Sequence, residues 1–218
     1  MEEIKTVGRR HLAEQGSAAL SLRAVARELG MVSSAVYRYF PSRDQLLTAL
    51  IIDAYDAVGF AAEQAAVESR RAGLVSRWMT TADAIRTWAL INPHEYALIY
   101  GSPVPGYAAP VDTIDPAARV SLALLGLVAE AVNGGEIVSD GRTHSIPRPV
   151  RSDLDLLRET AHLDIPHEVL SRVLQAWSQL FGTLSLEMFG HLHNVIHDFD
   201  AYFRYQMRRT AEMIVDAR

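Results

Sequence analysis

Apolar residues recur at intervals of three and four along almost the whole chain, which is the spacing of an amphipathic α-helix. Near the N-terminus this pattern predicts a helix that ends before Gly16, a short helix that follows the cap residue Ser21, and a second short helix over 33–40. Further helices are predicted over 42–69, 74–91, 93–100, 116–132, 152–161, 166–190 and 198–216. No sustained alternation of the kind found in β-strands interrupts the pattern. The sequence therefore predicts an all-α protein.

The two short helices and the turn at Gly30 have the dimensions of a helix-turn-helix, whose second helix enters the major groove of DNA. If Val32, Val36 and Phe40 face inward, helix geometry gives the second helix an outward face that is small, aromatic and cationic. This face and its flanks comprise Ser33, Ser34, Tyr37, Arg38 and Tyr39. The alternative is an incidental helical hairpin, which any all-α protein can contain.

Composition and charge narrow the class of protein. The chain has 218 residues, of which 49% are hydrophobic, and this fraction excludes a disordered chain. It has no Cys, so disulfides and Cys-based metal sites are excluded and a reducing cytoplasm is expected. The acidic start of the chain does not resemble a signal peptide, and no membrane partner is expected. The net charge of -5 divides into +2 over residues 1–50, with seven basic and five acidic side chains, and -7 over the remainder.

The sequence over residues 12–50 resembles the DNA-binding domain of TetR-family transcriptional regulators. The resemblance is carried by Ser-Leu-Arg-Ala-Val-Ala-Arg-Glu-Leu-Gly at 21–30 and by Val-Tyr-Arg-Tyr-Phe-Pro-Ser-Arg at 36–43. It implies a three-helix head, a fourth helix that links this head to a helical body, and a homodimer on palindromic DNA. It implies phosphate contacts from Ser21, Arg23, Tyr37, Tyr39 and Arg43, with Ser33, Ser34 and Arg38 nearer the bases. Because Val32 stands where the family often has Ser or Thr, the second helix is expected to take its cap from Ser33.

The remainder of the chain, about 75–215, resembles a regulatory-domain subclass of the same family that carries a Trp-His-Gly stretch. Here the stretch is Trp177-Ser-Gln-Leu-Phe181-Gly182, with Phe181 in place of the histidine. The resemblance implies a domain that binds a ligand and forms a dimer. Candidate ligand contacts are Trp88, Tyr96, Tyr100, Tyr107, Trp177 and Phe181, although aromatic residues at helical spacing are also typical of a core. Candidate dimer contacts on the last two long helices are Leu180, Leu184, Met188, Phe199, Phe203 and Met213.

Signals for an enzyme are weak. The stretch 101–106 copies half of a phosphate-binding loop, but Tyr107 stands where the required lysine would be. His191, His193 and His197 fall in a connection between helices, where solvated histidines are commoner than metal ligands. We therefore expect no metal, no cofactor and no catalysis.

Taken together, these patterns predict a cytoplasmic, ligand-responsive repressor that binds a palindromic operator as a homodimer. Residues 1–50 are expected to form its DNA-binding domain. Residues 51–218 are expected to form a domain for dimerisation and for a small-molecule effector of unidentified structure. The alternative is a small α-helical metal-binding or hydrolytic protein in which the helix-turn-helix is incidental.

Overall fold

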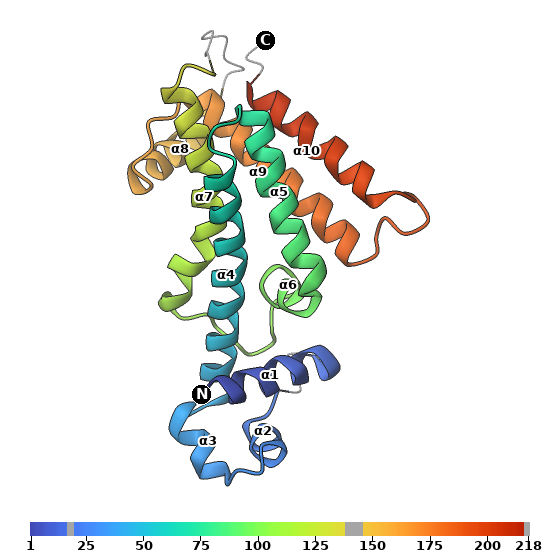
Figure 1. The fold of residues 1–218 in the computed structure, drawn as a ribbon. Coiled ribbons are helices and arrows are strands. Elements are labelled where there is room, and N and C mark those ends of the chain that lie inside the picture. Colours follow the sequence, from blue (N-terminus) through green and yellow to red (C-terminus); the bar gives the residue numbers. More distant parts are fainter. Residues whose placement is uncertain (17–19, 138–145, 216–218) are drawn as a thin grey trace. The chain divides into compact units, whose positions relative to one another are not determined.

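The structure is a computed structural model that describes residues 1–16, 20–137 and 146–215. Every regular element of these residues is helical, which confirms the all-α prediction (Figure 1). The helices are α1 (Glu2–Gln15), α2 (Leu22–Glu28), α3 (Ser33–Tyr39), α4 (Arg43–Glu68), α5 (Leu74–Ile91), α6 (Pro93–Tyr100), α7 (Ile114–Asn133), α8 (Arg148–Thr160), α9 (His167–Met188) and α10 (Phe199–Val215). A short 3-10 helix, η2 (Val111–Thr113), precedes α7.

The predicted and observed helix ends differ most at the start of α8. The sequence places this start at residue 152, after two prolines, whereas α8 begins at Arg148 with Pro147 as its N-cap and Pro149 in its first turn. Proline is tolerated there because the first amide groups of a helix have no carbonyl partner within the helix. The cap predicted at Ser21 is confirmed: the Ser21 hydroxyl accepts a hydrogen bond from the Ala24 amide at 3.5 Å. The Ser42 hydroxyl likewise accepts one from the Gln45 amide at 3.1 Å.

The chain divides into two compact units. We call Met1–Gly59 together with Ala89–Ala118 the N-terminal unit, and Phe60–Trp88 together with Arg119–Arg218 the C-terminal unit. Helices α4, α5 and α7 each contribute residues to both units. The domain boundary predicted at residue 50 falls inside α4, and the N-terminal unit continues past it and includes α6.

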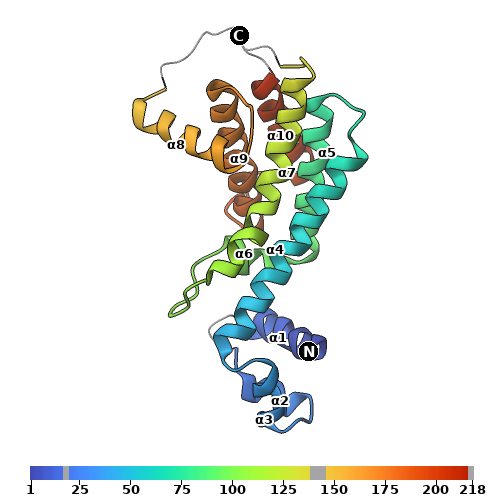
Figure 2. The same cartoon turned by 90° about the vertical axis from the view of Figure 1, so that its left-hand side faces the viewer.

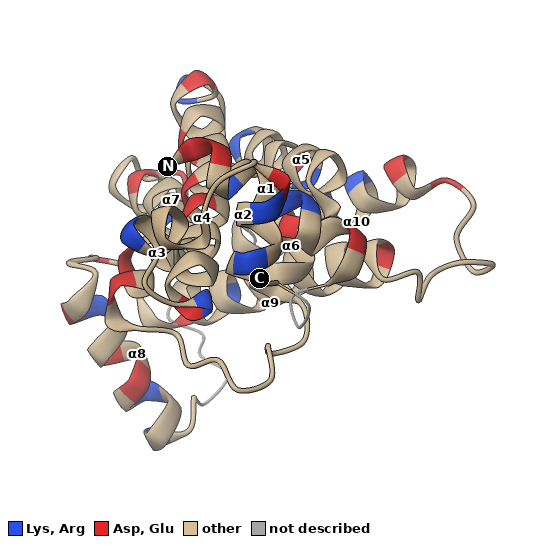
Figure 3. Cartoon of the chain, turned by 90° about the horizontal axis from the view of Figure 1, so that it is seen from below, with Lys and Arg blue, Asp and Glu red and all other residues tan. Residues whose placement is uncertain are grey.

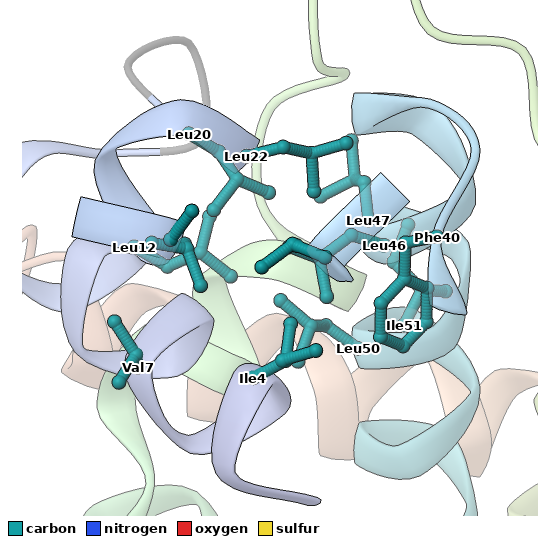
Figure 4. Packing of buried hydrophobic residues seen from close by; sticks show 13 residues of the cluster. Ile4, Val7, Leu12, Leu20, Leu22, Phe40, Leu46, Leu47, Leu50 and Ile51 are labelled. Carbon is teal, nitrogen blue, oxygen red and sulfur yellow. The ribbon is translucent and has the colours of Figure 1, made fainter. Parts of the chain in front are cut away.

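The core of the N-terminal unit is built by the apolar faces of its first four helices (Figure 4). Ile4 and Leu12 of α1 pack there with Leu46 and Leu50 of α4. The approach of α1 to α4 is close: a Cβ at Gly8 would lie 3.2 Å from Leu50 Cδ1. A Cβ at this position would require the Leu50 side chain to move by a few tenths of an ångström.

Helix α4 is long and apolar enough to cross a membrane when judged by length and composition alone. The core helix of a soluble protein can be equally long and apolar, and 44% of the apolar 18-residue stretch of α4 is buried. Leu46, Leu47, Leu50 and Ala54 on this helix are buried within the N-terminal unit. Its apolar character is explained there by core packing.

In the C-terminal unit, α9 and α10 lie side by side (Figures 1 and 2). Helix α10 begins after Asp198, whose carboxylate accepts a hydrogen bond from the Ala201 amide at 2.9 Å. The core of this unit contains Trp78 and Phe203, both fully buried. A buried ion pair between Arg86 of α5 and Glu187 of α9 crosses the unit.

Candidate nucleic-acid interface

The turn between α2 and α3 gives the helix-turn-helix its shape. Gly30 has a φ of +63°, which residues with a Cβ rarely adopt. The Met31 amide donates to the Ala26 carbonyl at 2.9 Å, and the Gly30 amide donates to the Arg27 carbonyl at 3.2 Å. These two bonds form a Schellman motif, which satisfies the last carbonyls of α2 and reverses the chain toward α3.

The start of α3 differs from the prediction in two ways. Ser33 is the first helical residue, and the N-cap is Val32, which has an extended backbone and makes no side-chain cap. The expectation that Ser33 caps the helix is therefore wrong. Val32 is also 70% exposed, because a residue outside the helix does not share the inward face of Val36, which is fully buried.

The outward face of α3 is nevertheless the predicted one. Tyr37 and Tyr39 are 40% and 54% exposed, and Ser33, Ser34 and Arg38 are exposed beside them. Val36 and Phe40 anchor the helix from the opposite side. Helix α3 carries no acidic residue. The result is a helix that presents hydroxyls, two aromatic rings and one guanidinium to solvent.

The acidic residue of the helix-turn-helix, Glu28, is directed toward α1. Its carboxylate contacts the guanidinium of Arg10 and lies 2.8 Å from Nε2 of the buried His11. These contacts offset the negative charge of Glu28. The outward face of α3 therefore keeps its positive character.

A count of residues overstates the positive charge of residues 1–50, because several basic side chains there pair with carboxylates. Figure 3 marks the basic and acidic positions along the chain. Lys5 Nζ lies 2.7 Å from the Asp53 carboxylate, and Arg9 contacts the carboxylates of Glu2, Asp53 and Glu95. The Arg10 guanidinium pairs with the Glu28 carboxylate. These three basic side chains of α1 are thus offset by carboxylates of the same unit.

Three other arginines make no ion pair with any described residue. They are Arg23 and Arg27 on α2 and Arg38 on α3, and all three are exposed. Arg27 was not among the predicted DNA contacts, although its place one helical turn after Arg23 is the signal that could have identified it. Arg43 at the start of α4 is partly buried, with Nη1 3.1 Å from the Asp44 carboxylate.

The predicted ligand contacts fall into two groups. Tyr96 and Tyr100 lie together in the N-terminal unit with ring centroids 5.1 Å apart, and Tyr55, which was not predicted, meets Tyr100 edge to face. Burial, together with the neighbouring tyrosines, raises the pKa of the Tyr100 hydroxyl. Tyr107 belongs to the same unit and is bonded to Thr48.

Trp88, Trp177 and Phe181 belong to the C-terminal unit. The rings of Trp177 and Phe181 are 5.3 Å apart, and Trp88 is largely buried. A hollow of about 450 Å³ opens in this unit between α5 and α10, but none of the predicted ligand contacts lines it. Their ligand role remains a prediction.

Three histidines lie in the connection between α9 and α10, where the sequence places them. They are His191, His193 and His197. Among the described residues, no group of three or more His, Asp or Glu side chains is placed to hold a metal ion.

Comparisons with known proteins agree with this geometry. Residues 4–50 match the model described as bacterial regulatory proteins, tetR family, and residues 78–210 match the tetracyclin repressor-like C-terminal domain. The HTH-type transcriptional regulators Mb1846 of Mycobacterium bovis and Rv1816 of Mycobacterium tuberculosis are each 41% identical over 190 residues, which cover 86% of this chain and 80% of theirs. The crystal structure of the regulatory protein SCO4313 superposes with a TM-score of 0.79 at 34% identity, covering 96% of this chain and 93% of that one.

A helix-turn-helix with an exposed cationic and aromatic second helix, followed by a helical body, defines a DNA-binding transcriptional regulator. The relatives are described as transcriptional or regulatory proteins, which agrees with this class. The chain belongs to the TetR family. The match over 78–210 does not distinguish the Trp-His-Gly subclass, which remains a prediction.

Proposed function

We propose that the protein is a cytoplasmic, non-enzymatic repressor that binds a palindromic operator as a homodimer and releases it when a small molecule binds. The observation that carries this proposal is the outward face of α3, which is exposed, aromatic, cationic and free of carboxylates. The first four helices hold this face on a packed core. Such a helix fits the major groove, in which base edges are read by direct contact.

Roles for the individual side chains follow from their positions. Ser33, Ser34 and Arg38 on α3 are proposed to approach the bases, and Arg is the side chain suited to bidentate contact with guanine. The proposed phosphate contacts are Ser21, Arg23, Tyr37, Tyr39 and Arg43, to which the structure adds Arg27. The Ser21 hydroxyl accepts from the Ala24 amide, so its own proton remains available to a phosphate oxygen.

A phosphate contact by Arg43 has a measurable signature. Arg43→Ala is expected to weaken binding about equally on all DNA sequences and to lower the slope of log affinity against log salt by about 1, because one phosphate is no longer neutralised. The measurement is a salt titration of binding to a fragment that the purified protein selects from genomic DNA. Arg209→Ala is the matched control, since Arg209 also pairs with a nearby carboxylate but lies on α10. A change of sequence preference at constant salt slope would contradict this role.

The residues predicted for the dimer contact are only partly available to a second copy. Leu180, Leu184 and Phe203 are fully buried within the chain, because the apolar stripes of α9 and α10 face their own core. Met188, Phe199 and Met213 keep partial exposure. The six residues therefore do not form one exposed surface, and another face of α9 is the better candidate.

That face, which we call the α9 face, lies opposite the buried stripe of the helix. It consists of Leu174, Ser178, Gly182, Leu186 and Phe189, all exposed. A Cβ at Gly182 would meet no atom within 4 Å, and glycine inside a helix costs about 1 kcal/mol relative to alanine. No contact with a described residue requires glycine there. Close approach of a second copy of α9 would require it, and we propose this face as the centre of the dimer contact.

Gly182→Arg tests the α9 face. The substitution favours the helix and has room within one chain, but it places a long cation in the proposed contact. We expect a folded monomer by analytical ultracentrifugation, with unchanged helical circular dichroism. Gly126→Arg is the matched control, because Gly126 lies inside α7 and its Cβ would also meet no atom within 4 Å. Retention of the dimer by Gly182→Arg would exclude this surface.

A further inference from the structure

The segment that follows α6 turns back sharply within the N-terminal unit. The Tyr107 amide donates to the Val104 carbonyl at 3.2 Å, which closes a four-residue turn. Pro105 occupies its second position and Gly106, with a φ of +76°, its third. This is the pattern of a type II turn, in which proline and a residue with positive φ are favoured at these positions. Val104 and Tyr107 are partly buried against the core of the N-terminal unit.

The turn places the Tyr107 hydroxyl on the first turns of α4. The Tyr107 hydroxyl oxygen lies 2.8 Å from Thr48 Oγ1, and Thr48 donates to the Asp44 carbonyl at 2.8 Å. A threonine hydroxyl has one proton, and that proton is used on the carbonyl. Tyr107 is therefore the donor to Thr48. A chain of two hydrogen bonds runs from Tyr107 to the backbone of Asp44.

These two hydrogen bonds lead to the backbone beside Arg43. Asp44 follows Arg43 directly, and its carboxylate lies 3.1 Å from Arg43 Nη1. Both residues belong to the first turn of α4, where the amides lack helical carbonyl partners and the helix tends to fray. The serine cap at residue 42 restrains this turn from one side. The hydrogen bonds of Tyr107 and Thr48 also restrain it, and Tyr107 lies 59 residues from Thr48 in the sequence.

We propose that Tyr107 is a positioning residue for DNA binding, which acts through Thr48 on the first turn of α4 and so on Arg43. This inference rests on the proposed phosphate contact of Arg43. It gives Tyr107 a role different from the ligand contact predicted from the sequence. The aromatic ring packs on the core of the N-terminal unit, whereas the hydroxyl aligns the arginine.

The test uses the full-length protein and the genomic fragment that the wild type selects, with affinity measured across a range of salt concentrations. Tyr107→Phe keeps the ring and removes only the hydroxyl. Loss of one hydrogen bond should weaken DNA binding about 3- to 10-fold. The salt slope should fall toward the value of Arg43→Ala. Thr48→Val should reproduce this result and Thr48→Ser, which keeps the hydroxyl, should bind as the wild type does. Tyr205→Phe, at an exposed tyrosine of α10, is the matched control.

A double-mutant cycle separates positioning from general stability. If Tyr107 acts through Arg43, Tyr107→Phe should add little to the loss already caused by Arg43→Ala. Wild-type affinity in Tyr107→Phe, an undiminished further loss in the Arg43→Ala background, or a loss at unchanged salt slope would each overturn the inference. In all three cases the wild type still binds its fragment, and the proposed function stands. A wild-type protein that selects no DNA would overturn both.

Discussion

Tyr37→Ala should abolish specific operator binding while the protein stays folded and dimeric. Tyr37 is 40% exposed on α3, next to the fully buried Val36 that anchors the helix. Truncation therefore removes a ring and a hydroxyl from the proposed DNA face without opening the core. A loss of about 100-fold is expected, because the truncation removes both the proposed phosphate contact and the ring that carries it.

The measurement is a shift assay on the selected genomic fragment, with the oligomeric state followed on a sizing column. Tyr37→Phe separates the contribution of the hydroxyl from that of the ring. Tyr205→Ala is the matched control, because Tyr205 is an exposed tyrosine on α10. If Tyr37→Ala still repressed normally in cells, α3 would not be the helix that enters the major groove.

The second large effect is expected on stability, at Arg86. Its guanidinium pairs with both carboxylate oxygens of Glu187, at 2.9 and 2.6 Å, and with Asp200 at 2.7 Å. It also lies 5.1 Å from the centre of the Phe203 ring. Arg86 and Glu187 are largely buried, whereas Asp200 is mostly exposed. The hydrogen bonds to Glu187 are the main reason that the pKa of Arg86 is raised.

Arg86→Ala should lower the free energy of unfolding by about 3 kcal/mol or more, because it leaves the Glu187 carboxylate buried without a partner. The effect is measured by urea denaturation at one fixed protein concentration, since dimerisation would contribute to the apparent stability. Asp200→Ala should cost less than about 1 kcal/mol, as expected for an exposed partner. Replacing Arg86 with Met and Glu187 with Leu together should recover much of the loss. An Arg86→Ala protein as stable as the wild type would show that the pair contributes no net stability.

Part of the proposed DNA interface is a local feature of the sequence, and that part was predicted well. The cap at Ser21 and the turn at Gly30 each depend on residues within a few positions of one another. The first residue of α3 was predicted correctly, but its cap was not, because Val32 has an extended backbone although its apolar side chain suggested an inward helical position. The helical period applies only to residues inside the helix.

Predictions that needed a partner far along the chain were less successful. The basic residues of α1 counted as a positive contribution to DNA binding, but Lys5 and Arg9 are paired with Asp53. Leu180 and Leu184 suggested a dimer surface because both are apolar and lie on a long helix, but they face the core of their own unit. Apolar character predicts burial without telling whether the chain itself or a second copy provides it.

The sequence by itself determined the helical class, nearly all helix limits, the helix-turn-helix and the family, because helical period, caps and breaks are local properties of the chain. Tertiary structure decided which charges are offset and which hydroxyls are bonded. Arg9 meets Asp53 across 44 positions, Tyr107 meets Thr48 across 59, and Arg86 meets Glu187 across 101. Local periodicity carries no information about such pairs, since they form only when separate helices pack together.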